Sequence, residues 1–298
     1  MQCSKCGRTA VFFQTYSGQH LCLHHFTADV EAKAKHEIRR NHSLRSGDHI
    51  AVGLSGDACS SALLYFLKKL ISNRRDIRIS AISIDEGIAG YRFLGDSERI
   101  TELLQTECIA QSFQENVGRT LDDIAETKGK TRSCTYCRVI RNFLLNRIAR
   151  ENRVTKIACG STLDDAAGSV LNHILKGIPE IVVGSDVSFR GKIPRIRPFI
   201  AVPKEEIALY ADLHVKEYNR SHCPYTNNHF DEDVDAMLNE FTLHHPATKY
   251  ALLSLKKNLA RACVSLPDFS SSCERCGEPV IGICQNCRII DEVTAHGA

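Results

Sequence analysis

The sequence predicts an α/β protein: a doubly wound parallel sheet with helices on both faces, flanked by N- and C-terminal zinc-binding knots. Two observations support this prediction. Short apolar runs alternate along the chain with segments whose apolar residues recur at helical spacing, which is typical of a parallel sheet covered by helices. Near each end of the chain, four metal-ligating side chains stand in pairs that enclose two other residues.

Each strand and helix follows from a local pattern. The apolar run 49–54 and the alternating run 77–84 are expected to be strands, and each is followed by a polar turn and a helix. The polar segment 128–132 is expected to be a mobile loop. Further strands are expected at 108–113 and 156–160, and helices at 28–44, 62–67, 100–104, 138–150, 163–176 and 228–265.

The loops of most interest lie at one edge of this sheet. Ligands of doubly wound proteins bind beyond the carboxyl ends of the parallel strands. We therefore expect a site in the loops that follow Leu54, Ile84 and Cys159.

The terminal knots have the ligand spacing of structural zinc. A pair of thiolates separated by two residues forms a tight turn, and a second pair completes a closed tetrahedron. The alternative is a chance grouping of buried cysteines. A segment of about 30 residues cannot bury enough apolar surface to fold alone, so a metal would supply the missing stability. The two expected ligand sets are Cys3, Cys6, Cys22 and His25, and Cys273, Cys276, Cys284 and Cys287.

Composition limits the classes of function. The 298 residues are 43% hydrophobic and 24% charged, with a net charge of +3, as in a soluble globular protein. No apolar run reaches membrane-spanning length, and no signal peptide is recognised, so we expect a cytoplasmic protein with reduced cysteines. A basic stretch could contact phosphates or simply form a solvated helix face; it contains Lys33, Lys35, Arg39, Arg40 and Arg45.

The domain boundaries expected from these patterns divide the chain into five parts. They are an N-terminal zinc finger (1–27), a basic helical linker (28–48), an α/β domain (49–225), a helical extension (226–268) and a C-terminal zinc ribbon (269–298).

Two groups inside the chain carry chemistry. Ser55, Ser60 and Ser61 surround a turn at the start of a helix, where backbone N–H groups can bind an anion, although most such turns bind nothing. Cys134 and Cys137 form a third cysteine pair, and Cys223 stands alone far downstream. Three thiolates can hold an iron–sulfur cluster with one open iron. A third zinc site and a redox dithiol remain as alternatives.

The chain resembles, from end to end, the tRNA 2-thiolation enzymes of the TtuA type and the archaeal and eukaryotic wobble-uridine thiolases, which belong to the PP-loop ATP pyrophosphatase superfamily. The resemblance covers both knots and a series of internal motifs. These motifs are Ile50-Ala51-Val52-Gly53-Leu54-Ser55-Gly56, Ile84-Asp85-Glu86-Gly87-Ile88-Ala89-Gly90-Tyr91-Arg92, Cys134-x2-Cys137, Leu163-Asp164-Asp165-Ala166, Arg195-Ile196-Arg197-Pro198-Phe199 and His222-Cys223-Pro224-Tyr225.

The resemblance implies a reaction and its cofactors. ATP with Mg²⁺ would adenylate the C2 oxygen of a uridine in tRNA, and sulfur would then displace AMP. The three internal cysteines would hold a [4Fe–4S] cluster. The partners implied are tRNA, a ubiquitin-like sulfur carrier protein or inorganic sulfide as donor, and a second copy in a homodimer. The implied nucleotide site contains Ser55, Gly56, Ser60, Ser61, Asp85 and Gly160, and the implied catalytic residues are Arg141, Asp164 and Asp165.

The two aspartates have a simpler alternative role, because they follow Leu163 at the start of an expected helix and can act as caps.

The loop that should cradle phosphate departs from the family pattern Ser-Gly-Gly-x-Asp-Ser. Asp57 replaces a glycine and Cys59 replaces the acidic residue, while Gly160-Ser161-Thr162 replaces Gly-His-Asn. A carboxylate beside a triphosphate is repulsive by about 1 kcal/mol in water. The alternative function is therefore a catalytically degenerate or ATP-independent relative that binds tRNA or handles sulfur as a partner subunit.

Cys59 is expected at a helix N-terminus, where the helix dipole would lower its thiol pKa. It is either an inert replacement or a catalytic thiol that accepts sulfur as a persulfide.

Overall fold

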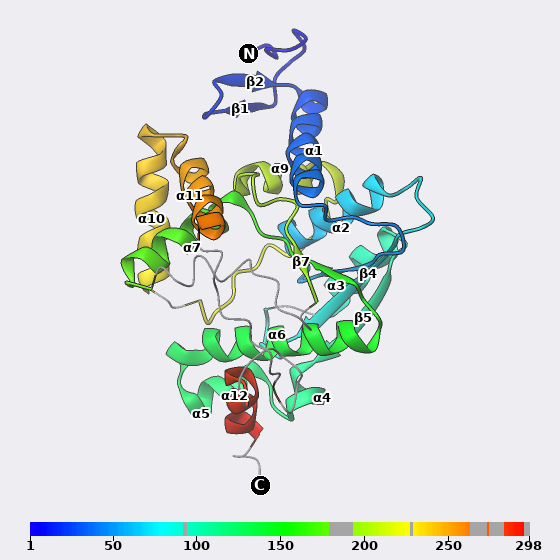
Figure 1. Cartoon of the computed structure of the whole chain (residues 1–298), viewed down its shortest axis with the longest axis vertical. Coiled ribbons are helices and arrows are strands. Elements are labelled where there is room, and N and C mark those ends of the chain that lie inside the picture. The colour runs from blue at the N-terminus through cyan, green and yellow to red at the C-terminus, as the bar shows by residue number, and fades with distance from the viewer. Residues whose placement is uncertain (92–93, 179–192, 227–228, 263–272, 274–282, 295–298) are drawn as a thin grey trace.

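The computed structural model describes residues 1–91, 94–178, 193–226, 229–262, 273 and 283–294. Within these residues, a five-stranded sheet has the strand order β5-β4-β3-β6-β7, and every neighbouring pair is parallel. Helices pack on it, as Figure 1 shows. The predicted parallel α/β fold is confirmed.

The sheet strands are β3 (His49–Gly53), β4 (Arg78–Asp85), β5 (Glu107–Ser112), β6 (Lys156–Ala158) and β7 (Arg195–Ile196), and the separate hairpin is β1 (Phe12–Gln14) and β2 (Gln19–Leu21). The helices that precede the chain midpoint are α1 (Leu23–Arg40), α2 (Ala58–Leu70), α3 (Leu94–Leu103), α4 (Phe113–Val117), α5 (Leu121–Lys128), the 3-10 helix η1 (Lys130–Arg132) and α6 (Ser133–Glu151). The later ones are α7 (Leu163–Leu175), α9 (Lys204–His214), α10 (His229–His244), α11 (Thr248–Ala262) and α12 (Gln285–Thr294).

The central strand β3 shows why both faces of the sheet are covered. Successive side chains of a strand point to opposite faces. Ile50 and Val52 accordingly join one core cluster, with α1, α2 and α9, whereas Ala51 joins a second cluster with α6 and α12. The strand is apolar throughout because neither face meets water.

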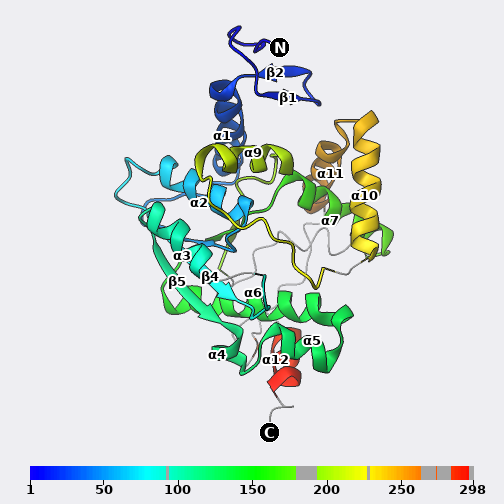
Figure 2. The ribbon, with the colours of Figure 1, turned by 180° about the vertical axis from the view of Figure 1, so that it is seen from behind.

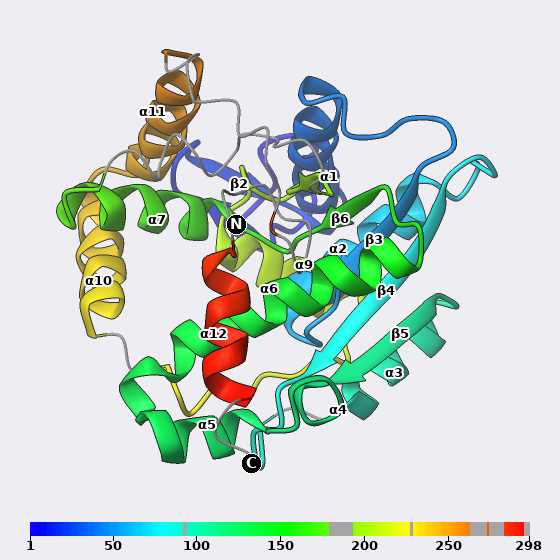
Figure 3. The ribbon, with the colours of Figure 1, turned by 60° about the horizontal axis from the view of Figure 1, so that its bottom comes forward.

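The N-terminal hairpin and α12 lie at opposite ends of the molecule, and the view from behind in Figure 2 agrees with Figure 1. Figure 3 shows α12 lying across α6, where Val293 is fully buried in the second core cluster. Helix α1 is itself part of the first core cluster, through Phe26, Val30 and Ala34. The expected boundary between a zinc finger and a linker at 27/28 therefore falls inside α1.

One local expectation is wrong. The segment 128–132, expected to be a mobile loop, contains the last residue of α5 and the 3-10 helix η1, which leads directly into α6. Gly129, whose φ is +89°, is the C-cap of α5 and separates α5 from η1. The polar residues of this segment therefore belong to the end of α5 and to η1, two short helices, and not to an unstructured loop.

No helix among the described residues is long and apolar enough to cross a membrane.

Candidate functional site

The loops that follow β3 and β6 meet at the carboxyl edge of the sheet, as predicted. A Cβ atom placed on Gly160 would lie 3.0 Å from the backbone nitrogen of Ser60 and 3.2 Å from Sγ of Cys59. Only a glycine allows this close approach between the β6 loop and the first turn of α2. The structure therefore brings Gly160 together with the predicted phosphate loop.

The phosphate loop turns at Gly56, whose φ of +75° lies in the left-handed region that favours glycine. The backbone nitrogen of Ser55 donates to Oγ of Ser60 at 3.2 Å, and the two serine hydroxyls lie 3.1 Å apart. Ser61 is fully buried, and among the described residues its hydroxyl has no hydrogen-bond partner. The serine hydroxyls thus lie together at the start of α2, the arrangement that the predicted anion site requires.

Asp57 occupies part of that anion site with its own carboxylate. It is the N-cap of α2, and its Oδ1 accepts a hydrogen bond of 2.8 Å from the backbone nitrogen of Ser60. An N-cap carboxylate satisfies one of the N–H groups that an incoming phosphate would otherwise accept from. The departure from the family pattern therefore has a definite structural role, which is to cap the helix.

Cys59 lies in the first turn of α2, but the expected lowering of its pKa is wrong. Burial raises the pKa of the Cys59 thiol well above its ordinary value, and the negative charges of Asp57 and Asp165 raise it further. Desolvation disfavours the thiolate more than the helix dipole favours it. The position is therefore occupied by a neutral thiol.

The two aspartates at the start of α7 make structural contacts. Asp165 forms a capping box with Thr162, in which its carboxylate accepts the Thr162 backbone N–H at 2.7 Å. Asp164 accepts from the backbone nitrogen of Lys204 at 2.7 Å and pairs with Nζ of Lys249 at 2.6 Å. The capping alternative thus accounts for Asp165, while Asp164 connects α7 to α9 and α11.

The loop after β4 contains one functional candidate that sequence reasoning missed. Asp85 only stabilises its own turn, by accepting from the Gly87 backbone N–H at 2.8 Å. Glu86 is 1% exposed, and its carboxylate pairs with the guanidinium of Arg141 at 2.8 Å. A buried acid directly after a central strand is the signal that could have identified Glu86.

Arg141 also reaches the internal cysteines. Its Nη2 donates to Sγ of Cys137 at 2.9 Å, so the guanidinium lies between this sulfur and Glu86. Burial raises the pKa of Cys137 to about 11, although the charge of Arg141 opposes the shift.

The structure brings the three internal cysteines together from two distant segments. Cys134 and Cys137 lie in the first turns of α6. Sγ of Cys134 donates to the backbone oxygen of Tyr225, two residues after Cys223, at 2.9 Å, and Cys223 packs against the core cluster that contains Cys137. The three thiols thus lie in one region of the molecule, and Cys137 is beside a cationic guanidinium that suits an anionic thiolate-ligated cluster.

The N-terminal ligand set has the size of a single tetrahedral ion. All four ligand atoms lie within 4.8 Å of one another. Two sulfurs, of Cys6 and Cys22, are 3.7 Å apart, and Nδ1 of His25 is 3.4 and 3.5 Å from the sulfurs of Cys3 and Cys22. Zinc bond lengths in a regular tetrahedron give about 3.8 Å between two sulfurs and about 3.5 Å between sulfur and nitrogen. The residues therefore fit zinc.

The C-terminal set agrees where it is described. Cys273, Cys284 and Cys287 are buried with their sulfurs within 4.8 Å of one another, and the sulfurs of Cys273 and Cys287 are 3.8 Å apart. The fourth expected ligand, Cys276, lies outside the described residues. Among those residues, the three internal cysteines do not form so tight a group, and a cluster with four irons requires a wider spacing than one ion does.

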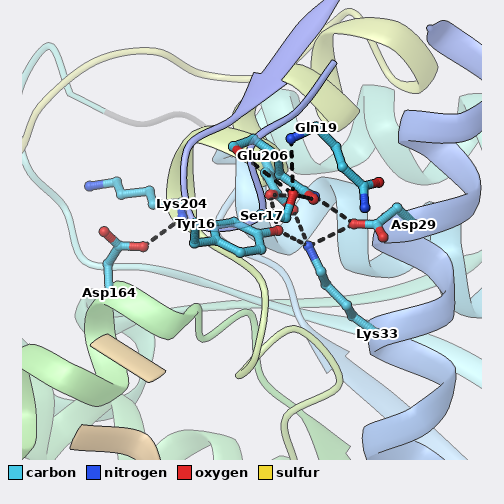
Figure 4. A network of polar contacts seen from close by, with 9 residues as sticks. Tyr16, Ser17, Gln19, Asp29, Lys33, Asp164, Lys204 and Glu206 are labelled. Atoms are coloured by element: carbon cyan, nitrogen blue, oxygen red, sulfur yellow. Dashed lines mark hydrogen bonds and ion pairs between the residues drawn. The ribbon is translucent and has the colours of Figure 1, made fainter. Parts of the chain in front are cut away.

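The basic stretch after the first knot divides into two parts. Lys33 belongs to a polar network that joins the hairpin, α1 and α9 (Figure 4): its Nζ lies 2.8 Å from Glu206, which is fully buried, and 2.7 Å from Asp29. Tyr16 donates to the same Glu206 at 2.5 Å. Arg39 and Arg40, at the end of α1, and Arg45 are exposed, whereas Lys35 pairs with Glu31. The exposed arginines suit contact with RNA phosphates, whereas Lys33 is held within the network.

Comparison with known proteins gives consistent matches over the whole chain. A family model described as "2-thiouridine synthetase TtuA, N-terminal LIM domain" matches residues 2–27, and a model of the PP-loop domain matches residues 27–228. The tRNA 2-thiolation protein NcsA of Haloferax volcanii is 31% identical over 99% of this chain and 100% of its own. The tRNA-5-methyluridine(54) 2-sulfurtransferase of Pyrococcus horikoshii is 30% identical over 97% of this chain and 93% of its own.

One solved structure is similar over nearly the full length. The U34-tRNA thiolase NcsA from Methanococcus maripaludis, solved with its [4Fe-4S] cluster, superposes with a TM-score of 0.87 at 26% identity, and the match covers 98% of this chain and 96% of that one.

Proposed function

Because the chain belongs to the TtuA/NcsA-type family of tRNA 2-thiolation proteins with a PP-loop domain, we propose that it is a sulfurtransferase that replaces the C2 oxygen of a uridine in tRNA by sulfur. The relatives' names place their sulfur at different uridines, one at position 34 and another at position 54. The shared chemistry is therefore 2-thiolation of uridine, and the proposal is made at that level. The observation that supports it most directly is the convergence of Cys134, Cys137 and Cys223 beside Arg141.

The reaction requires two consecutive displacements. The uracil O2 attacks the α-phosphorus of ATP and releases pyrophosphate, and sulfur then attacks C2 and releases AMP. On this proposal, Ser55, Ser60 and the N–H groups of the first turn of α2 bind the phosphates, which the contacts between the two serines support. Arg141 offsets negative charge near the cysteine sulfurs, which its hydrogen bond to Cys137 supports. Mg²⁺ would accompany the triphosphate.

The residues at the internal site fit the cofactor that the family implies. Cys134, Cys137 and Cys223 would hold a [4Fe–4S] cluster, which when bound supplies one iron position that no protein side chain fills. Arg141 would remain hydrogen-bonded to the Cys137 sulfur, because a guanidinium donates to a thiolate as well as to a thiol.

The terminal knots would hold structural zinc. All positions of the N-terminal tetrahedron are protein ligands, so no position is open for chemistry. On this proposal the five-part division given above holds except at 27/28, which falls inside α1, and the polar network around Glu206 fixes the first knot to the body of the protein.

The surface proposed for tRNA combines charge with exposed rings. The first 28 residues contain Lys5 and Arg8 but no acidic residue. On the outer face of the hairpin, the rings of Phe13 and His20 are in tilted contact with their centroids 4.5 Å apart, and Phe13 is 47% exposed. Basic surfaces with exposed aromatic rings suit single-stranded RNA. A ubiquitin-like sulfur carrier and a homodimer complete the proposal by family resemblance.

A second candidate function rests on Asp57. Because its carboxylate caps α2 inside the phosphate loop, the chain would bind ATP weakly and act as an ATP-independent, sulfur-handling partner. One experiment separates the two. Cluster-loaded protein is incubated anaerobically with ATP and tRNA. The proposed enzyme forms AMP and 2-thiouridine together, whereas a chain that forms neither, or thiolates without AMP, is not the proposed ATP-dependent enzyme.

A further inference from the structure

The segment that carries Cys223 has no secondary structure to hold it. Residues 219–226, here called the strap, follow α9 without helix or strand. In Figure 2 this yellow segment descends from α9 toward α6. Asn219, Cys223 and Tyr225 are half-buried, while the residues between them are exposed. A segment without ladder hydrogen bonds and with few buried side chains keeps its place only through specific anchors.

The first anchor is Asn219, and every group of its side chain is used. Its Nδ2 donates to the backbone oxygen of Tyr91 at 3.1 Å and to Oδ2 of Asp96 at 2.9 Å, and its Oδ1 accepts from the backbone nitrogen of Ser221 at 2.7 Å. Its backbone nitrogen donates to the oxygen of Gly56 at 2.7 Å. Asn219 thus attaches the strap to the loops that follow β3 and β4.

The second anchor is Tyr225. Its hydroxyl donates to Oδ1 of Asp122 at 2.6 Å, and Oδ2 of the same carboxylate accepts from the backbone nitrogen of Ala89 at 2.8 Å. Its backbone oxygen accepts from the Cys134 thiol. That thiol loses its proton when it binds iron, so the hydroxyl contact to Asp122 is the anchor that persists with a cluster in place.

From these contacts we propose that Asn219 and Tyr225 are positioning residues that hold Cys223, from the two ends of the strap, at the place where it meets Cys134 and Cys137. The inference rests on the proposed function, because it presumes that these cysteines ligate the cluster. Neither residue is a ligand itself. Each limits the motion of the strap, because Cys223 must supply the third ligand beside the two ligands on α6.

The chain offers a matched control for the tyrosine. Tyr218 lies just outside the strap, and its hydroxyl donates to an aspartate, Asp212, at 2.7 Å, compared with 2.6 Å for Tyr225. The pKa is raised to about 12 in both: for Tyr218 by burial and the hydrogen bond to Asp212, for Tyr225 by the hydrogen bond to Asp122 and burial. Tyr→Phe therefore removes a hydrogen bond to a carboxylate at both positions. At Tyr218 the ring beneath Arg220 and the ion pair of Arg220 with Asp212 remain, so that end of the strap keeps its contacts.

The test measures the cluster and not the reaction. Reconstituted wild type, Tyr225→Phe and Tyr218→Phe are treated anaerobically with an iron chelator, and the decay of visible absorption is followed. Losing a hydrogen bond to a carboxylate should accelerate iron release from Tyr225→Phe by about fivefold or more and alter the electron paramagnetic resonance spectrum of the reduced cluster. Tyr218→Phe should match wild type within about twofold. Equal behaviour of the two variants, fast or slow, would overturn the proposal.

A charge exchange tests the other anchor. Asn219→Asp places a carboxylate against Asp96 and should speed iron release at least as much as Tyr225→Phe does. Adding Asp96→Asn removes the repulsion and restores one hydrogen bond, so the double variant should recover part of the loss. A double variant no better than Asn219→Asp alone would contradict the role of Asn219. Cys223→Ser tests the premise separately. If this variant retains the cluster, the proposed ligation is wrong. If it loses the cluster while Tyr225→Phe and Asn219→Asp release iron as wild type does, only the anchoring roles are refuted.

Discussion

Replacing Asp57 by Asn is expected to tighten the binding of Mg-ATP. Asp57 caps α2 through a contact of 2.8 Å to the Ser60 backbone nitrogen, so a phosphate oxygen at the same helix end would lie within about 4 Å of the carboxylate. Two unit charges at that distance repel by about 1 kcal/mol in water and about 4 kcal/mol near a protein surface. Because the Asp57 side chain is exposed, the lower figure applies. The dissociation constant should fall by about fivefold.

Asn is chosen because it removes the charge and keeps the cap. Asn and Asp cap helices about equally well, so the free energy of unfolding should change by less than about 0.5 kcal/mol, whereas Asp57→Ala should lose about 1 kcal/mol. Affinity is measured by calorimetric titration at low and at high salt. The gain should shrink at high salt, because the Debye length falls from about 10 Å at 0.1 M to about 3 Å at 1 M.

Asp123→Asn is the matched control for this substitution. Its carboxylate accepts the Thr120 backbone N–H at 2.8 Å at the start of α5, so it has a capping role away from the phosphate loop. That variant should bind Mg-ATP as wild type does. If Asp57→Asn is as stable as wild type and binds Mg-ATP no more tightly at low salt, the carboxylate is not what weakens the site, and the reasoning from charge is refuted.

Four further predictions follow from the metal centres, the basic surface and the buried thiol. Anaerobic reconstitution should load about four irons per chain with broad visible absorption, and Cys223→Ser should lose both while the zinc content stays unchanged; iron retained after all three internal cysteines are changed to Ser would defeat the assignment. Cys284→Ser should release about one zinc and destabilise the C-terminal segment, with the circular dichroism of the sheet domain preserved; global unfolding would show that this knot belongs to the core. Arg39→Ala with Arg40→Ala should weaken tRNA binding and reduce its salt slope by about two, and an unchanged slope would place the RNA surface elsewhere. Because burial raises the pKa of Cys59 above its ordinary value of 9.0, its thiolate fraction stays small up to that pH, so mass spectrometry should find it unalkylated by iodoacetamide at pH 8; rapid labelling there would mean a reactive thiolate.

The sequence alone was sufficient to predict the architecture and the grouping of the terminal cysteines. Apolar runs such as 49–54 predict buried parallel strands because both faces of such strands are covered, and the structure places β3 at the centre of the sheet. Pairs of cysteines separated by two residues predict metal sites because a tight turn aims both sulfurs at one point. These are local properties, set by residues a few positions apart, and the interatomic distances within the N-terminal knot agree with them.

The tertiary structure decided everything that depends on burial or on contacts between distant segments. Lys33 appears in the sequence as one more basic residue, yet it pairs with Glu206, 173 positions away. Cys59 appears as a helix-terminal thiol, but desolvation and neighbouring carboxylates reverse the expected shift of its pKa. The pairing of Glu86 with Arg141 of α6 and the contacts of Asn219 with Gly56 and Asp96 likewise join segments that only the folded chain brings together. Side-chain periodicity indicates which face of an element is apolar. The free energy of a charged group depends on its exposure to water and on neighbouring charges, and both are set only once the chain has folded.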